Sequence, residues 1–572
     1  MEFKRILVLD GDMIPALTVA RALHRSGLSI DLGCHLSNSL TSFSNATEKE
    51  LKYPNPLTDE QAFIRWLIDI YHTNTYGMII PVTERTLIPL VKASEQIGAE
   101  FLPLPTLEAL NTVLDKSLTI KLADDLGITT PASILVSEEK DLDLCGSMPF
   151  PIVIKPARSI GNNEEHRKQL SVDYAFNKQE LKDKTLQHLA YTPVLIQEYF
   201  KGQGVGIELI ANNGTIEYSF QHLRLHEVPL TGGGSSYRKS VAVEPILLDA
   251  SQKLIKALNW HGVVMVEFKW RPDTQEYRLM EINGRFWGSL PLALASKANF
   301  PLMLYELFKN KAIKKHEPYS TGVYCRNLSR DIQWLEHVLR KNAPPELYKF
   351  PSISDIGKEY LHIFLPKHKF DVQTLSDIKP GIHDLREIVI YYYDRIKNIL
   401  IEKRKLKHYS KKAKGGSLVA HLTPNATILF LCYGNINRSA IAECLFNKIA
   451  PDMGFKVKSA GLHQVANRPA DPVMVNVAKQ SDINLSSWSS TSITQEMIES
   501  SDIIFAMETR HCDAIIEKHP QAAEKCFLLG MTAGSGEISD PYGLPPTIYE
   551  NCFKEVENNI QEIVKIMKSL HN

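Results

Sequence analysis

The sequence has few cysteines, and their spacing supports neither a metal site nor a disulfide framework. Eight cysteines are scattered over 572 residues, and no two are spaced as Cys-x-x-Cys. Paired cysteines at short spacing are typical of structural zinc sites and of small secreted domains held by disulfides. We therefore expect reduced thiols and no structural zinc.

The chain also lacks a long apolar segment and a net charge. It contains no run of about 18 apolar residues, the length that a membrane-spanning helix needs. In its first residues, "MEFKRILVLDGD", the apolar stretch is too short for a secretory signal and is typical of a first strand followed by a turn. Lys+Arg and Asp+Glu both number 65, so no overall field attracts nucleic acid or anionic lipid. We predict a cytoplasmic protein without a nucleic-acid partner.

The order of apolar runs predicts an α/β multidomain chain. In residues 1–105 the runs "RILVLDGD", "SIDLGCH" and "GMIIPVTERT" alternate with helical patterns, which indicates a small doubly wound domain with a parallel sheet. Residues 106–315 show strands in hairpin order, with "ANNGT" as a strong turn signal. This second region is therefore predicted to be α+β with antiparallel sheets.

Residues 316–424 are weakly patterned and are predicted to form a mixed or helical extension that ends in a basic linker. Seven Lys or Arg residues lie between 403 and 414, and two glycines follow at 415 and 416. A solvated basic helix is one interpretation, and a helix on a membrane surface is the alternative. We favour the first and expect no membrane-surface partner. From 425 to 572 strands and helices interleave again, which predicts a further α/β domain with a parallel sheet.

The segment "LCYGNINRSA", residues 431–440, places Cys432 in a turn between a predicted strand and a predicted helix. The N–H groups of such a turn lower the pKa of a thiol and form a cradle for an anion. Arg438 can bind two phosphate oxygens at once. We expect Ser439 to donate a hydrogen bond to the sulfur and Asn435 to brace the loop. A buried structural cysteine in a tight turn is the alternative interpretation.

The remainder of this domain decides between the two interpretations. "CYGNINRS", followed by "SAG" at 459–461 and "SDPYG" at 539–543, resembles the low molecular weight protein tyrosine phosphatases over roughly residues 425–572. The resemblance implies that Cys432 is the nucleophile and that Asp540 acts first as general acid and then as general base. It also implies that Tyr542 lines the entrance and helps to select an aromatic leaving group, and that no metal is needed.

Three departures from the family pattern are visible. Asn437 stands where the family usually has a second cysteine, Ala440 where proline is common, and "LSSWSS" where a histidine-containing segment is common. The first removes a disulfide partner for Cys432, so we expect oxidation of this thiol to be harder to reverse. The first two leave the nucleophile, the arginine and the acid unchanged, and the third bears on the choice of substrate.

Lysines and oxygen ligands follow one another in the first 315 residues. Lys116 lies in "VLDKSLTIKLADDLGI" and Lys155 ends the predicted strand "PIVIKPA". Glu281 and Asn283 are two positions apart on a strand and so share a face, and Glu267 lies on the preceding strand. Such ligands suit Mg²⁺ that carries nucleotide phosphates. Taken singly, each residue could be a solvated lysine or part of an exposed strand edge, but the ordered set favours a nucleotide site.

This order resembles the ATP-grasp ligases, in particular the carbamoyl-phosphate-synthase-like branch, over about residues 1–315. The resemblance implies a small pre-ATP-grasp domain ahead of two α+β lobes that close on ATP and Mg²⁺. By this resemblance, Lys116 and Lys155 contact the ATP phosphates, and the hinge formed by Gln197, Glu198 and Tyr199 binds adenine. One or two Mg²⁺ ions are held by Glu267, Glu281 and Asn283. Arg285 stabilises the charge on the transferring phosphoryl group or acyl phosphate.

A glycine-rich stretch, "VPLTGGGSSYRKS" at 228–240, is predicted to close over a ligand, with Arg238 reaching an acidic substrate. A simple flexible connection is the alternative.

Together the two resemblances predict a bifunctional enzyme. One half would join a small-molecule carboxylate to an amine or similar nucleophile through an acyl phosphate, and the other would hydrolyse a phosphorylated substrate such as a phosphotyrosine protein. An alternative is a phosphatase regulated by an ATP-grasp domain that senses nucleotide without ligating. A third reading is an interaction protein recruited to membranes by its basic segment.

Overall fold

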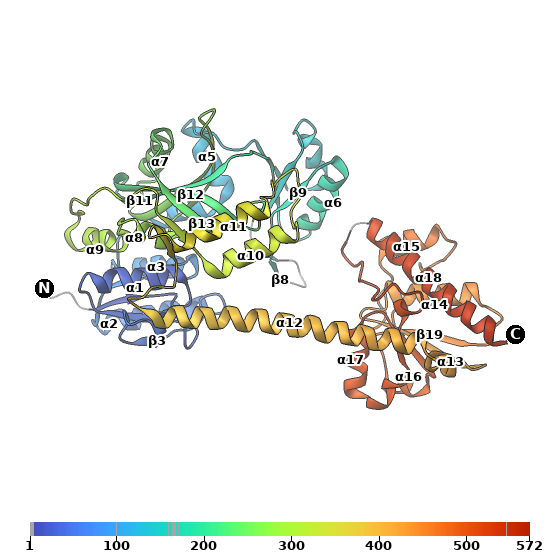
Figure 1. The fold of residues 1–572 in the computed structure, drawn as a ribbon. Coiled ribbons are helices and arrows are strands. Elements are labelled where there is room, and N and C mark those ends of the chain that lie inside the picture. Colours follow the sequence, from blue (N-terminus) through green and yellow to red (C-terminus); the bar gives the residue numbers. More distant parts are fainter. Residues whose placement is uncertain are drawn as a thin grey trace. The chain divides into compact units, whose positions relative to one another are not determined.

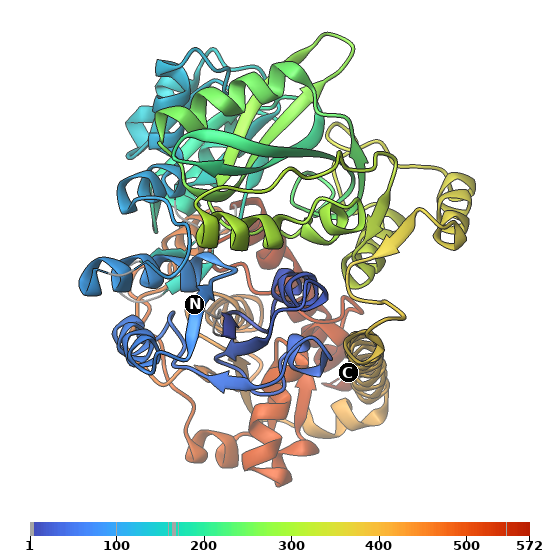
Figure 2. The same ribbon diagram turned by 90° about the vertical axis from the view of Figure 1, so that its left-hand side faces the viewer.

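The computed structural model describes residues 5–98, 100–157, 160–162, 167–169, 171–544 and 546–571. The chain forms two compact units, Met1–Val389 and Ile390–Asn572. Figure 1 and Figure 2 show the elements of both. None of the described helices combines the length and the apolar character that crossing a membrane requires.

The first unit begins with a parallel sheet in the order β3-β2-β1-β4. The chain runs from β1 outward to β2 and β3 and then returns to the other side of β1 with β4, as in doubly wound folds. The prediction of a small doubly wound domain is confirmed. Its elements are β1 Arg5–Val8, α1 Ile14–Arg25, β2 Ile30–Cys34, η1 Leu40–Phe43, β3 Glu50–Lys52, α2 Glu60–His72, β4 Tyr76–Ile80 and α3 Glu84–Ile97.

Next come two α-helices and an antiparallel sheet in the order β5-β10-β6-β9. A separate pair of short strands, β7 and β8, follows β6 in the chain. The elements are α4 Leu107–Leu114, α5 Lys116–Asp125, β5 Ser133–Val136, η2 Glu139–Cys145, β6 Ile152–Pro156, β7 Ile160–Asn162, β8 Arg167–Gln169, β9 Asp173–Ala175, α6 Lys178–Leu189 and β10 Val194–Glu198.

A seven-stranded sheet, β15-β14-β11-β12-β13-β16-β17, completes the first unit. The "ANNGT" turn joins β11 to β12, with Asn213 and Gly214 both at positive φ, as a tight hairpin requires. Helix α7 packs on β11 and β12 (Figure 2). The elements are β11 Gln203–Asn212, β12 Thr215–Val228, β13 Gly234–Val241, α7 Pro245–Ala257, β14 Gly262–Arg271, β15 Glu276–Asn283, α8 Leu290–Ala295 and α9 Phe300–Asn310.

The weakly patterned region after residue 315 adds two short strands to this sheet and a series of helices. Its last helix, α12, is one continuous helix that crosses the division between the two units (Figure 1). Nothing in the sequence pattern predicted the two strands, which have three residues each. The elements are β16 Tyr324–Arg326, α10 Leu328–Leu339, α11 Ile353–Leu361, η3 His362–Phe364, β17 His368–Phe370 and α12 Ile378–Lys414.

The second unit is built on a parallel sheet, β19-β18-β20-β21. The residues of β18, "TILFLC", alternate between two hydrophobic clusters, so the strand is covered on both faces, as is usual for parallel sheets. Tyr409 and Ala413 of α12 pack in the cluster that contains Leu429 and Leu431. Lys412 Nζ donates hydrogen bonds to the carbonyl oxygens of Ala523 and Cys526.

Helix α12 therefore forms part of the core of this unit. The remaining elements are α13 Gly416–His421, β18 Thr427–Cys432, α14 Arg438–Ile449, β19 Lys456–Gly461, α15 Pro472–Lys479, α16 Gln495–Ser500, β20 Ile503–Ala506, α17 Thr509–Lys518, η4 Pro520–Ala523, β21 Cys526–Leu528, η5 Leu529–Met531 and α18 Pro546–His571.

Candidate active sites

The first unit contains a cleft of about 1340 Å³. Its lining comes from loops and helix starts that follow the strands of the N-terminal parallel sheet, from strands of the four-stranded and seven-stranded sheets, from the first turn of α10 and from the second and third turns of α12. All nine residues that the sequence assigns to nucleotide, metal or phosphoryl group line this cleft: Lys116, Lys155, Gln197, Glu198, Tyr199, Glu267, Glu281, Asn283 and Arg285.

Oxygen ligands meet on the facing strands β14 and β15. Glu267 and Glu281 are directly paired in the antiparallel register, and Asn283 Nδ2 donates hydrogen bonds to Glu267 Oε1 at 3.2 Å and Glu281 Oε1 at 3.1 Å. Burial raises the pKa of Glu267 to about 7, although a salt bridge to Arg224 opposes this. Two carboxylates and an amide converging at one place form a donor set that fits Mg²⁺.

Two lysines in the cleft have no carboxylate partner within the described ranges of the chain. Lys155 lies on β6 and Lys116 begins α5. Burial, and next the positive charge of Lys116, lower the pKa of Lys155 to about 8, while Glu281 opposes the shift. A polyanion placed between the two lysines would relieve their mutual repulsion, so this pair suits a chain of phosphates.

The low pKa of Lys155 predicts that MgATP binding depends on pH. In the free protein Lys155 loses its proton as the pH rises through about 8, and a bound phosphate would hold that proton. Binding above pH 8 must therefore take up a proton, and the MgATP affinity should fall about tenfold between pH 7 and pH 9. Calorimetric titrations in two buffers of different ionisation enthalpy measure both quantities.

Lys155→Arg is the control, because its guanidinium stays charged over this range. In that variant the affinity should be nearly constant between pH 7 and pH 9. A wild-type affinity that does not change with pH would show that Lys155 does not contact the nucleotide.

The side chains of the predicted hinge are held by protein partners. Gln197 Nε2 donates to Ser133 Oγ at 2.8 Å, Glu198 pairs with Arg278 at 3.2 Å, and the Tyr199 hydroxyl donates to the carbonyl of Leu347 at 3.2 Å. The backbone of Gln197 and Glu198 is paired with the neighbouring strands β5 and β6 or with the residue ahead of β5.

The two predicted arginines differ in position. Arg285 lines the cleft, with its Nε at 3.3 Å from Glu84 Oε1. Arg238 is 1% exposed, and its Nη2 pairs with Asp371 Oδ1 at 2.5 Å. Strand alternation along β13 turns Arg238 toward the interior, where a buried carboxylate neutralises it. The prediction that Arg238 reaches a substrate is therefore wrong, although the neighbouring Gly232, Gly233 and Gly234 do line the cleft.

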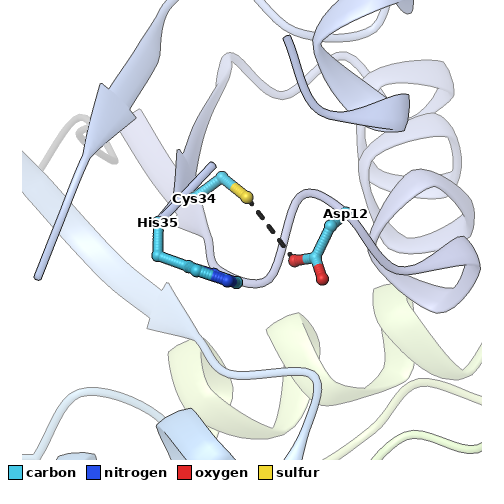
Figure 3. Close-up of side chains that lie close together, drawn as sticks. All are labelled: Asp12, Cys34 and His35. Atoms are coloured by element: carbon cyan, nitrogen blue, oxygen red, sulfur yellow. Dashed lines mark hydrogen bonds between the residues drawn. The ribbon is translucent and has the colours of Figure 1, made fainter. Parts of the chain in front are cut away.

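One further cluster lies at the edge of the cleft. Figure 3 shows Asp12, Cys34 and His35 lying close together, with the Cys34 thiol donating to Asp12 Oδ1 at 3.5 Å. Their ligand atoms all lie within 4.8 Å of one another. Asp12 is also paired with Arg85, which binds Asp10 as well. Because a guanidinium already balances the Asp12 carboxylate, we assign no metal to this cluster.

In the second unit, Cys432 ends β18 and Arg438 begins α14. The loop between them has Asn435 at φ 53°, which allows the backbone N–H of Asn435 to donate to the sulfur at 3.1 Å. Ser439 Oγ lies 2.9 Å from the sulfur. Asn435 Nδ2 donates to Ser439 Oγ at 3.0 Å and to Ser459 Oγ at 2.8 Å. Ser439 and Asn435 thus form one hydrogen-bonded group with the sulfur of Cys432.

Two segments distant in sequence hold this loop. Trp488 Nε1 donates to the carbonyl of Asn435 at 2.8 Å, and the Thr491 N–H donates to Asn435 Oδ1 at 2.7 Å. A Cβ on Gly461 would lie 2.8 Å from the Tyr433 carbonyl oxygen. The glycine of "SAG" is therefore required by close contact with the loop, and the tryptophan of "LSSWSS" supports it. The sequence did not assign a role to this tryptophan.

Arg438 lies at the centre of an ion-pair cluster. It is 1% exposed, its Nη2 lies 2.6 Å from Asp540 Oδ2, and its Nη1 pairs with Glu508 and donates to the carbonyl of Ile538 at 2.9 Å. Burial opposes the charge on Arg438, but Cys432 and the two carboxylates raise its pKa. The arginine therefore remains charged beside the thiol. Glu508 carries no motif that would have revealed it in the sequence.

Aromatic side chains and one unusual amide complete this site. Tyr433 follows Cys432 and is 52% exposed, and Tyr542 follows the Asp540 loop and is 65% exposed. Asn437 is buried, and within the described chain neither of its side-chain polar atoms has a hydrogen-bond partner. Nucleophile, guanidinium and acid thus lie together, with exposed aromatic residues close to them in sequence.

Comparisons with known proteins match two regions of the chain. A model described as low molecular weight phosphotyrosine protein phosphatase matches residues 427–572, and one described as ATP-grasp in the biosynthetic pathway with Ter operon matches residues 190–330. The low molecular weight protein-tyrosine-phosphatase Etp of Escherichia coli (strain K12) is 36% identical over 139 residues, which are 24% of this chain and 93% of Etp. The protein-arginine-phosphatase of Bacillus subtilis (strain 168) is 34% identical over 145 residues, 25% of this chain and 96% of that protein.

Solved structures show similarity to the same two regions. The YwlE arginine phosphatase from Geobacillus stearothermophilus is 32% identical with a TM-score of 0.24 and covers 25% of this chain and 94% of its own. N5-carboxyaminoimidazole synthetase from Staphylococcus aureus, complexed with ADP, is 13% identical with a TM-score of 0.47 and covers 60% of this chain and 87% of its own. Through its C-terminal domain the chain belongs to the low molecular weight phosphotyrosine protein phosphatase family, and residues 190–330, which precede this domain, match the ATP-grasp model.

Proposed function

We propose that the protein is a bifunctional enzyme, an ATP-dependent carboxylate–amine ligase in its first unit and a protein tyrosine phosphatase in its second. The observation that carries the ligase half is the convergence of all nine predicted residues on one cleft. The observation that carries the phosphatase half is the contact of Arg438 with Asp540 beside Cys432.

In the ligase reaction, Lys116 and Lys155 would hold the phosphates of ATP. Mg²⁺ held by Glu267, Glu281 and Asn283 would neutralise phosphate charge. A carboxylate oxygen of the acid attacks the γ-phosphorus, the bond to the β-phosphate oxygen breaks, and ADP leaves. Arg285 would stabilise the charge on the transferring group. An amine then attacks the acyl phosphate and releases inorganic phosphate and a proton, which leaves an amide.

In the phosphatase reaction, the Cys432 thiolate attacks phosphorus while Arg438 and the loop N–H groups bind the phosphate oxygens. Asp540 donates a proton to the leaving oxygen as the P–O bond breaks. A water molecule then attacks the cysteinyl phosphate, Asp540 accepts its proton, and the P–S bond breaks. The exposed Tyr433 and Tyr542 favour an aromatic leaving group, so we assign phosphotyrosine in a protein as the substrate.

The experiment that tests the ligase half is ADP release from MgATP by the purified full-length chain, offered pools of carboxylic acids and amines. We expect ADP to form only when one acid and one amine are both present, and that pair identifies the substrates. If MgATP binds but no acid and amine give ADP, the ligase assignment fails. The protein would then be a phosphatase that carries a nucleotide-sensing domain.

A further inference from the structure

The cations of the cleft are unequally neutralised. Seven lysine and arginine side chains line it: Arg85, Lys116, Lys155, Arg224, Lys269, Arg285 and Arg330. Four of them are paired with carboxylates. Arg85 binds Asp10 and Asp12, Arg224 binds Glu227 and Glu267, Lys269 binds Glu227, and Arg285 binds Glu84.

Three cations of the cleft thus have no carboxylate partner in the parts of the chain that the structure describes. In the proposed function, Lys116 and Lys155 bind the ATP phosphates. Arg330 is the third of these cations, and the proposed function gives it no ligand. Its side chain forms no hydrogen bond or ion pair with a described residue, and the residue is exposed at the cleft. An arginine with five N–H donors and no acceptor is an open site for an anion.

The guanidinium of Arg330 lies directly against Gly234. Arg330 is the third residue of α10, and its backbone N–H donates to the side-chain oxygen of Asn327, which caps the helix, at 3.0 Å. A Cβ built on Gly234 would lie 1.9 Å from Arg330 Nη1. Any other residue at 234 would displace the guanidinium, so the last glycine of the glycine-rich stretch makes room for Arg330.

The surroundings raise the energy of this guanidinium when no anion is bound. Partial removal from water, followed by the nearby charge of Arg238, lowers the pKa of Arg330, and Asp371 opposes the shift. Asp371 is already engaged with Arg238 in a buried ion pair. An anionic group of a ligand would therefore supply the negative charge that balances Arg330, because no carboxylate of the described chain is paired with it.

We propose that Arg330, lying against Gly234, binds a second anionic group of the acid substrate. The acid would then carry two anionic groups, one carboxylate that is activated and one carboxylate or phosphate held by Arg330. This inference rests on the proposed ligase function and specifies its substrate class. It also gives the glycine-rich stretch a role, with Arg330 in the place that the sequence assigned to Arg238.

The test uses the full-length chain saturated with a non-hydrolysable MgATP analogue. Matched pairs of acids are titrated and followed by thermal shift and calorimetry. The dicarboxylate arm compares acids such as succinate and glutarate with their monoamides, and the phosphate arm compares acids such as 3-phosphoglycerate with glycerate. We expect at least one dianion to bind at least about tenfold more tightly than its neutral partner, and the arm that responds identifies the group.

Variants test whether Arg330 causes the preference for a dianion. Arg330→Gln should abolish the discrimination between a dianion and its partner and leave MgATP affinity unchanged, whereas Arg330→Lys should keep part of it. Gly234→Ala should weaken dianion binding too, because its Cβ displaces the guanidinium. Arg340→Gln, which alters an exposed arginine just past the end of the same helix, is the matched control.

Two results would overturn the inference: no dianion is preferred by the wild-type protein, or Arg330→Gln discriminates as well as the wild type does. Failure of the ligase assignment looks different. In that case dianions bind through Arg330, but no acid and amine cause ADP release.

Discussion

Replacing Cys432 with serine is expected to reduce kcat/KM for aryl phosphates by at least about 10⁴-fold, because a neutral hydroxyl replaces the only sulfur nucleophile of the loop. The hydroxyl can still occupy the position 2.9 Å from Ser439 Oγ, so the loop should remain folded. Hydrolysis of p-nitrophenyl phosphate and of a phosphotyrosine peptide measures the loss. Acid- and amine-dependent ADP release by the same variant should be unchanged.

Cys444→Ser is the matched control, because Cys444 lies on α14 away from the loop and is half-buried. This variant should retain nearly full phosphatase activity. Asp540→Asn separates proton transfer from attack by sulfur. It should slow hydrolysis of phenyl phosphate by about 10²-fold or more and that of 2,4-dinitrophenyl phosphate much less, since a better leaving group needs no proton. Equal losses on both esters would contradict the role of Asp540 as general acid.

Replacing Glu281 with alanine is expected to lower ADP release by about 10³-fold or more. Glu281 faces Glu267 across β14 and β15 and accepts a hydrogen bond from Asn283. Removing one carboxylate leaves too few oxygen ligands to hold a divalent cation against the nucleotide phosphates. Steady-state kinetics at several Mg²⁺ concentrations measure the effect, which excess Mg²⁺ should partly offset.

The matched control for this change is Glu276→Ala on the same strand. Glu276 is exposed and pairs with Arg271 at the far end of the hairpin, so its loss should leave turnover within about twofold. An effect of Glu276→Ala as large as that of Glu281→Ala would indicate general damage to β15 rather than loss of a metal ligand. Phosphatase activity should be unchanged in both variants.

Residues carried by regular strands were predictable because alternation fixes their faces. Glu281 and Asn283 could be placed together from their spacing, and the cleft brings Lys116 and Lys155 to the same place. Arg238 was misplaced because its partner, Asp371, lies 133 residues further along the chain. No local sequence pattern around Arg238 shows that it pairs with a buried carboxylate.

Contacts between distant segments account for the residues that the sequence did not reveal. Glu508 reaches Arg438 across 70 residues, and Trp488 reaches Asn435 across 53. Each looks ordinary in its own segment, where Glu508 precedes a helix and Trp488 lies in a serine-rich turn. Arg330 likewise appears as one more charged helix residue until the neighbouring glycine and the absence of a carboxylate are seen together.

The packing of α12 decides where the chain can be divided. Similarity to the phosphatase family begins at residue 427, yet Tyr409 and Ala413 share a hydrophobic cluster with Leu429 and Leu431, and Glu402 accepts a hydrogen bond from Thr509 Oγ1 at 3.1 Å. A recombinant fragment cut at the family boundary would lose Tyr409 and Ala413 from this cluster, expose part of the cluster to water and tend to aggregate. A soluble fragment of the phosphatase domain must therefore begin within α12, before Glu402.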